Sequence, residues 1–103
     1  MMLPLLTKTL KFKSDHDIRS FLWKKFPASR KYFVHKLVKS TEWTGKHKSE
    51  IESFFGSQRS VSDFTDRWSY YIETRNKKRY YLIFDFEKDL VTSVRYKVKD
   101  LGN

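Results

Sequence analysis

Residues 67–99 read RWSYYIETRNKKRYYLIFDFEKDLVTSVRYKVK. Apolar and polar side chains alternate along them with a period of two, which is typical of strands whose two faces meet different surroundings. Polar breaks at 75–78 and 88–89 divide the stretch into three segments. It therefore predicts a three-stranded antiparallel meander with one apolar face, which helices must cover in an α+β fold.

The alternation assigns the side chains of each strand to one of two faces. On the apolar face it places Trp68, Tyr70, Ile72, Tyr80, Leu82, Phe84, Phe86, Leu90, Thr92, Val94, Tyr96 and Val98. The opposite face receives tyrosines and cations, namely Tyr71, Arg79, Tyr81, Arg95, Lys97 and Lys99, with Ser69, Glu73 and Val91 beside them. The turn cations at its rim are Arg75, Lys77 and Lys78. The register thus predicts one cationic, tyrosine-bearing surface.

Ahead of the meander the sequence predicts a strand and a helical hairpin. Residues 6–13, LTKTLKFK, alternate like a first strand. Ser14 with Asp17 three residues later indicates a helix start, and apolar residues at helical spacing continue to Phe26. Pro27 ends that helix, and a second one follows.

Residues 41–66 predict an insertion or loop that contains one short helix. Ser49 and Glu52 have the spacing of a capping box, and Gly56 is a suitable helix stop. Trp23 and Trp43 are expected to fold back onto the core, the alternative being that they anchor a binding partner.

Size and charge limit the classes of function. The 103 residues fit a single domain, 1–103, and 39% hydrophobic residues can form a core despite 33% charged ones. Because 22 Lys and Arg face 12 Asp and Glu, the net charge of +10 favours a polyanion or an acidic protein as partner. Absence of cysteine excludes disulfides and thiolate chemistry. The apolar run MMLPLL is too short for a signal peptide or membrane span, so no membrane partner and a cytoplasmic location are expected.

Two stretches carry a resemblance to a known family. Residues 10–39, LKFKSDHDIRSFLWKKFPASRKYFVHKLVK, resemble the opening strand and helix pair of the RelE/ParE superfamily of toxin–antitoxin toxins. Residues 79–100, RYYLIFDFEKDLVTSVRYKVKD, are similar to its central hairpin, in which a tyrosine-led apolar strand turns into a last strand ending in cations. Residues 41–66 have no counterpart in the resemblance.

The resemblance implies an activity and a site. Ribosome-dependent nucleases of this superfamily cleave mRNA without metal or cofactor, using cations and a tyrosine on the exposed sheet face. A cation is expected directly after Tyr80, where this chain has Tyr81, a departure that puts nuclease activity in doubt. Arg79 is the substitute from the turn side, and Lys97 or Lys99 stands for the cation ending the last strand. An acidic antitoxin is the implied protein partner.

The chemistry of RNA cleavage fits the same residues. A metal-independent endoribonuclease needs a base, an acid and cations that stabilise the transition state. Arg95, Lys97 and Lys99 alternate along one strand roughly 7 Å apart, close to the spacing of successive phosphates. The predicted catalytic set is Arg79, Tyr81, Arg95 and Lys97, and the predicted binding set is Tyr71, Arg75, Lys77, Lys78 and Lys99.

The histidines and the remaining carboxylates give weaker indications of function than the cations of the sheet face. The spacings of His16, His35 and His47 match no metal motif, although His47 in the basic loop GKHK could act as an acid–base group. Asp85 and Glu87 are expected to neutralise cations across the strands. No metal or cofactor site is predicted.

Three functional hypotheses follow. The first is a toxin-like protein that binds RNA on the ribosome and cleaves it. The second is a non-catalytic inhibitor or immunity-type protein whose basic surface binds an acidic protein. The third is a simple nucleic-acid-binding module. A purely structural alternative is that the tyrosine and cation face is only a solvated sheet face.

Overall fold

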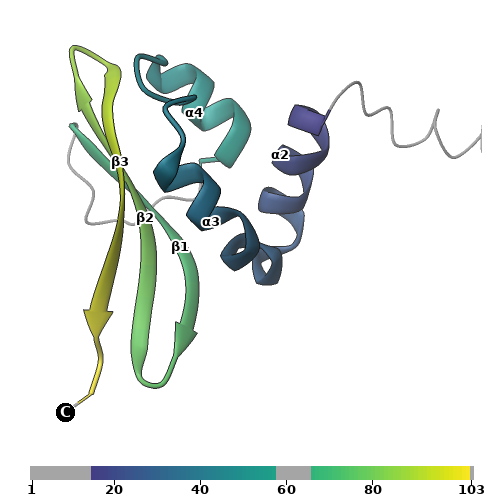
Figure 1. Ribbon diagram of the computed structural model, residues 1–103, viewed down its shortest axis with the longest axis vertical. Helices are drawn as coiled ribbons and strands as arrows, with labels where there is room; N and C mark the ends of the chain where they lie inside the picture. The colour runs from purple at the N-terminus through teal and green to yellow at the C-terminus, as the bar shows by residue number, and fades with distance from the viewer. Residues whose placement is uncertain (1–14, 58–65, 103) are drawn as a thin grey trace, which may run out of the picture.

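The computed structural model describes residues 15–57 and 66–102, which form an α+β fold with the helices on one face of a three-stranded antiparallel sheet (Figure 1). The elements are α2 (Asp15–Lys25), the 3₁₀ turn η1 (Pro27–Ser29), α3 (Arg30–Lys39), α4 (Lys48–Phe55), β1 (Arg67–Arg75), β2 (Lys78–Glu87) and β3 (Leu90–Asp100). The predicted helix pair, short third helix and C-terminal meander are thereby confirmed. The strand predicted over 6–13 lies outside the described residues.

Pro27 makes the corner between α2 and α3. Because proline lacks a backbone N–H and has a fixed φ, it ends α2 and starts the tight turn η1. The hydroxyl of Ser29 holds this corner, lying 3.1 Å from the carbonyl oxygen of Leu22 and 2.7 Å from that of Phe26. Beyond the corner the chain reverses, so that α2 packs on α4 while α3 packs on the sheet (Figure 1).

The N-terminus of α4 is capped by His47. Its Nδ1 accepts from the backbone N–H of Ser49 at 3.0 Å, and Glu50 Oε2 accepts from the backbone N–H of His47 at 3.1 Å. The predicted capping box of Ser49 and Glu52 is therefore wrong. The physical reason is that His47 is extended (φ −78°, ψ 153°) and bridged to the start of β3, so the helix begins as soon as the chain leaves that bridge.

The connection before α4 is tied to the start of β3. The N–H of Gly45 donates to the carbonyl of Val91, the N–H of Val91 donates to Lys46, and the N–H of Lys48 donates to Asp89, at 2.8–2.9 Å. The described part of the predicted insertion over 41–66 therefore belongs to the body of the fold.

Both hairpins turn on two residues with positive φ. These are Asn76 and Lys77 (53° and 60°) between β1 and β2, and Lys88 and Asp89 (52° and 68°) between β2 and β3. Two left-handed residues match the twist of the flanking strands, which makes such tight turns favourable. The two polar breaks were predicted as turns, and the structure confirms them.

β1 carries a bulge at Ile72, where its register on β2 slips by one residue. An extra residue on one strand reverses the facing of every residue after it. The bulge therefore moves Glu73 and Arg75 to the helix side of the sheet and Thr74 to the other face. The prediction that Glu73 shares a face with Tyr71 is wrong for this reason.

A second bulge lies at Thr92 in β3. Val91 opposes Phe86 and is buried, whereas Leu90 is 43% exposed. The prediction that put Leu90 and Thr92 on the apolar face and Val91 on the other is therefore wrong. From Val94 onward the predicted alternation holds.

An aromatic cluster forms the core between the helices and the sheet. Trp23 and Phe55 have ring centroids 5.0 Å apart, and Phe55 lies 4.9 Å from Phe84. The hydroxyl of Tyr70 donates to the carbonyl of Gly56, which ends α4 with φ of +92°. The largest fully buried side chains are Trp23, Trp43, Tyr70, Phe55, Phe84, Ile51, Leu82 and Val91. Both tryptophans therefore fold onto the core, as expected.

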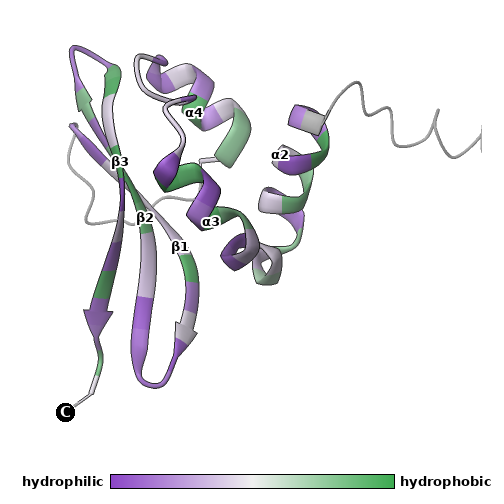
Figure 2. Cartoon of the chain, in the orientation of Figure 1, coloured by the Kyte–Doolittle hydropathy of each residue, from purple (hydrophilic) through white to green (hydrophobic). Residues whose placement is uncertain are grey.

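The turn end of the β1–β2 hairpin extends past the helices (Figure 1), and its residues are hydrophilic (Figure 2). Tyr70 lies under the helices and is fully buried, but Tyr80 is half-buried and Tyr96 is 41% exposed. Of the three tyrosines predicted to point into the core, Tyr70 is part of it and Tyr80 packs against it, whereas the prediction is wrong for Tyr96, which the described helices leave exposed.

Arg30 is a buried cation at the junction of α2, α3 and β1. Its Nε donates to the carbonyl of Trp23 at 2.9 Å and its Nη1 donates to the carbonyl of Tyr71, beside the bulge, at 2.8 Å. The guanidinium lies 4.8 Å from the centroid of the Trp23 ring. Burial lowers the pKa of Arg30, with the Tyr70 hydroxyl acting in the opposite direction. Hydrogen bonds and the aromatic ring replace the water that this charge has lost.

Replacing Arg30 by Ala should lower the free energy of unfolding by about 2–4 kcal/mol, because two carbonyls lose a charged donor. Urea denaturation followed by tryptophan fluorescence measures the change. The matched control is Lys31→Ala, the exposed neighbour, which should change stability by less than about 0.5 kcal/mol. Equal losses for the two variants would contradict the role given to Arg30.

Replacing His47 by Ala should destabilise the fold by about 1 kcal/mol, because α4 loses its side-chain cap. His47→Asn should retain most of the stability, since an asparagine side chain accepts the same bond. His35→Ala, at an exposed position on α3, is the control. If His47→Asn and His47→Ala are equally unstable in thermal denaturation, the cap is not the cause.

Candidate nucleic-acid interface

The second face of the sheet, turned away from the helices, is built from four cross-strand rows. From the β2–β3 turn toward the β1–β2 turn these rows are Arg67–Asp85–Ser93, Ser69–Ile83–Arg95, Tyr71–Tyr81–Lys97 and Thr74–Arg79–Lys99. Five of the six residues predicted for this face lie in the last two rows. The sixth, Arg95, lies in the row beside them. The predicted clustering is therefore present.

The two rows nearest the β1–β2 turn form the cationic half of the second face. Arg79 stands directly opposite Lys99, and Lys97 stands opposite Tyr81. Lys97 and Lys99 are exposed and Arg79 is half-buried. Within the described residues none of these three cations has a carboxylate partner. Like charges directly opposite each other are unfavourable in a sheet, so this half attracts an anion.

Two tyrosines border those cations. The rings of Tyr71 and Tyr81 meet edge to face with centroids 6.3 Å apart, and Tyr71 is 39% exposed. The Tyr71 hydroxyl lies 2.7 Å from Thr74 Oγ1. The alternation of residues along β1 does not predict Thr74 on this face. The bulge at Ile72 turns it there, and no pattern in the sequence indicates that bulge.

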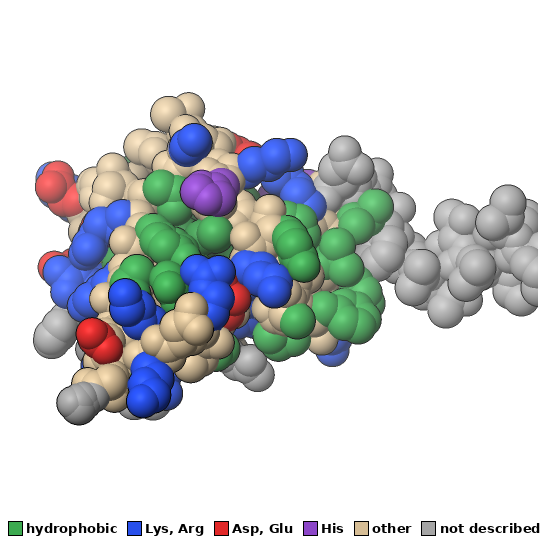
Figure 3. All heavy atoms as spheres, turned by 60° about the horizontal axis from the view of Figure 1, so that its bottom comes forward, with side chains coloured by type: hydrophobic (Ala, Val, Ile, Leu, Met, Phe, Trp, Pro, Cys, Tyr) green, Lys and Arg blue, Asp and Glu red, His purple; other side chains and the backbone are tan. Residues whose placement is uncertain are grey.

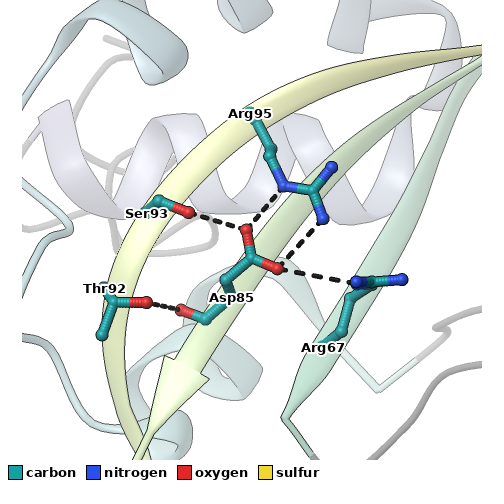
Figure 4. Close-up of polar contacts among 5 residues, drawn as sticks. All are labelled: Arg67, Asp85, Thr92, Ser93 and Arg95. Carbon is teal, nitrogen blue, oxygen red and sulfur yellow. Dashed lines mark hydrogen bonds and ion pairs between the residues drawn. The ribbon is translucent and has the colours of Figure 1, made fainter.

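Asp85 offsets part of the positive charge on the other half of the second face, where it contacts Arg95 and Arg67 (Figure 4). Arg95 donates to both of its carboxylate oxygens, from Nε at 2.6 Å and from Nη2 at 3.1 Å, and the Ser93 hydroxyl donates at 2.6 Å. Arg67 Nε lies 3.6 Å away. The hydrogen bond from Arg95 lowers the pKa of Asp85 and outweighs the opposing effect of burial, and the same bond raises the pKa of Arg95. Asp85 thus has the neutralising role predicted for it.

The predicted catalytic set is divided by this contact. Arg79, Tyr81 and Lys97 are neighbours on β2 and β3, and Lys97 is opposite Tyr81. Arg95 is held by a bidentate ion pair, which makes its guanidinium less available to a phosphate. Glu87, which was predicted to neutralise cations with Asp85, is exposed and pairs with Leu90 in the register.

The turn cations do not all lie at the rim of the second face. Arg75 stacks over the ring of Tyr80 on the helix side, 5.0 Å from its centroid, and pairs with Glu73 at 3.7 Å. The bulge at Ile72 causes this reversal. Lys77 and Lys78 are exposed at the end of the hairpin, where both faces meet.

The histidines contribute no metal site. His16 packs against Phe54 with ring centroids 4.8 Å apart, and His47 caps α4, which leaves it no role as a mobile acid–base group. Residues 15–57 and 66–102 contain no group of three potential metal ligands. Over the same residues, no helix combines the length and apolar composition that a membrane crossing requires.

A groove of about 870 Å³ lies between α2 and α3, where the two helices pack on different partners. Trp23, Leu37 and Phe54 contribute apolar surface to it, and Lys36 and Lys39 also line it. None of the predicted site residues lines this groove, so the predicted site is a surface of the sheet and separate from this hollow.

Comparisons with known proteins assign neither a family nor a function to the chain. No protein-family model, no curated protein and no solved structure matches the chain. The resemblance to RelE/ParE toxins stays a prediction.

Asp85→Asn should make the protein about 1 kcal/mol less stable at neutral pH, because a partly exposed bidentate ion pair is lost. The folded-state pKa of Asp85 is depressed, so its contribution is complete above the unfolded pKa of about 3.9 and disappears as the pH falls through the folded value. The difference between wild type and variant should therefore shrink below about pH 4.

Urea titrations across this pH range measure the difference, with Glu87→Gln as the control on the same strand. A difference that stays constant from neutral pH to pH 2 would show that the carboxylate of Asp85 is not its source.

Proposed function

We propose that this protein binds RNA through the cationic half of its second sheet face. The observation that carries the proposal is the like-charge pair of Arg79 and Lys99, with Lys97 next to it, and no carboxylate partner among the described residues. Holding like charges opposite each other costs stability, and a phosphate would relieve that cost. A net charge of +10 adds long-range attraction to a polyanion.

The spacing of these cations suits a phosphate backbone. Lys97 and Lys99 alternate on one strand and are roughly 7 Å apart. Arg79 lies across from Lys99 and offers a planar donor for a phosphate oxygen. The exposed ring of Tyr71 beside them can contact sugars or bases. A nucleic acid can use both the cations and the aromatic ring of this surface, whereas an acidic protein requires only the cations. The combination therefore favours a nucleic acid.

The proposal is for binding without cleavage. Arg95, one of the four predicted catalytic residues, is bound by Asp85. The position after Tyr80 holds Tyr81 where the resemblance implies a cation, and no histidine lies in the four rows of the second face. The carboxylate in the four rows, Asp85, is bound by Arg95 and Ser93 and lies outside the two rows that hold Arg79, Lys97 and Lys99. Those cations can bind and orient a phosphate, but the described residues of their two rows include no carboxylate or histidine to serve as a general base. Ribosome-associated RNA and an acidic antitoxin remain the partners that the resemblance implies.

The triple variant Arg79→Gln, Lys97→Gln, Lys99→Gln should bind a labelled single-stranded RNA at least roughly tenfold more weakly. The slope of log K against log salt should fall by about 0.7 for each lost phosphate contact. Fluorescence anisotropy at several salt concentrations measures both quantities. The combination of Lys31→Gln, Lys36→Gln and Lys39→Gln, three exposed cations on α3, is the charge-matched control and should change neither value strongly.

Asp85→Asn provides the opposite test. Freed from its carboxylate partner, Arg95 should become available to the RNA and raise the affinity. If the triple variant behaves like the α3 control, or if binding has no salt dependence, RNA binding by this face is excluded. Gel analysis of the RNA after incubation checks that it stays intact.

A further inference from the structure

A stack of three side chains lies on the helix side of the sheet, near the β1–β2 turn: Arg75 and Tyr96 are exposed, and Tyr80 between them is half-buried and packs against the core. The Tyr80 and Tyr96 rings have centroids 5.6 Å apart with an interplanar angle of 32°, and the Arg75 guanidinium lies 5.0 Å from the centroid of Tyr80. Tyr96 is 41% exposed on the edge strand β3. One side of the stack is thus closed by a cation, and Tyr96 has ring surface open to solvent.

The surroundings of the stack are apolar with a border of cations and one carboxylate, Glu73, which lies opposite Tyr80 and pairs with Arg75 at 3.7 Å. Val98 and Leu101 nearby on the chain are 44% and 42% exposed. Seen from the turn end, the molecule shows a gathering of hydrophobic side chains with many Lys and Arg and some Asp or Glu side chains around it (Figure 3). Lys77 and Lys78 at the turn are exposed, and within the described residues neither has a carboxylate partner. A tyrosine hydroxyl has an ordinary pKa of about 10 and is neutral at physiological pH. Burial is the main cause that raises the pKa of Tyr96 further.

The open aromatic ring and the nearby cations favour one kind of binding partner at the stack over another. A second copy of the chain would bring its own cations against Lys77 and Lys78, which is unfavourable for a protein of charge +10. An aromatic ring with its face open and cations around it matches a nucleobase with its phosphates, since every base has a π-face and stacking on tyrosine is tolerant of sequence.

The edge strand β3 joins this stack to the second face. Tyr96 and Val98 point to the helix side, whereas Lys97 and Lys99, which alternate with them, point to the second face. β3 has no neighbouring strand on its outer side among the described residues. A single nucleic-acid strand lying along this edge can therefore place phosphates on one face and turn a base onto the other.

We propose that the stack of Arg75, Tyr80 and Tyr96 is a base-stacking site, so that the RNA bound by this protein is single-stranded. The inference rests on the proposed function and specifies its substrate class. Bases in an A-form duplex are already stacked on each other and cannot reach an open tyrosine ring. Duplex RNA therefore uses only the phosphate contacts of the second face.

The test compares Tyr96→Ala with Tyr32→Ala, a control at a 73% exposed tyrosine on α3. Tyr96→Ala should weaken binding of a single-stranded oligoribonucleotide roughly tenfold. Its salt dependence should stay that of wild type, because no phosphate contact is lost. Binding of a duplex RNA should not change. In wild type, the Tyr96 ring protons should shift upfield when the single strand is added, as expected beneath a stacked base.

The outcomes separate this inference from the proposed function. If the Arg79, Lys97 and Lys99 variant loses affinity as expected but Tyr96→Ala binds the single strand like wild type, the stacking site is overturned and RNA binding stands. Equal weakening of single-stranded and duplex binding by Tyr96→Ala also overturns it. If instead the cation variant keeps full affinity, the proposed function fails, whatever Tyr96→Ala does.

Discussion

The arrangement of helices and sheet in this small protein depends on the two hydrogen bonds that the buried guanidinium of Arg30 donates. The guanidinium joins the carbonyl of Trp23 in α2 to the carbonyl of Tyr71, next to the bulge of β1. A backbone carbonyl that lies at a bulge needs a donor from outside the regular ladder, and a buried cation supplies a strong one. The helix pair is thus fixed to the sheet at the position where the strand changes its register.

That change of register determines the chemistry of both faces. Beyond Ile72 it sends Arg75 to the helix side, where the guanidinium covers Tyr80, and it brings Thr74 to the hydroxyl of Tyr71. Without the bulge, Arg75 would stand among the cations of the second face. The bulge therefore separates a surface whose cations have no carboxylate partner among the described residues from an aromatic stack on the opposite side of the same projecting strands.

A single carboxylate, that of Asp85, makes the charge of the two halves of the second face different. Asp85 binds Arg95 and lies near Arg67, so the rows near the β2–β3 turn hold two arginines and one carboxylate, while those near the β1–β2 turn hold three cations and no carboxylate. Alternation along the strands had grouped Arg95 with Lys97 and Lys99 as equivalent cations. Cross-strand distances make them different, since only Arg95 reaches Asp85 with a bidentate geometry.

The sequence by itself determined the α+β class, the three-stranded meander with its two turns, the corner at Pro27 and the cationic second face, because these follow from local periodicity, proline geometry and turn chemistry. Only the tertiary structure decided the bulges at Ile72 and Thr92, the cap at His47 and the burial of Arg30. Each of these depends on a partner far away in the chain, such as Tyr71 for Arg30 and Leu90 for His47. A pattern of neighbouring residues carries no information about such partners. The exposure of Tyr96 likewise depends on where the helices end over the sheet, which the alternation of residues along β3 does not specify.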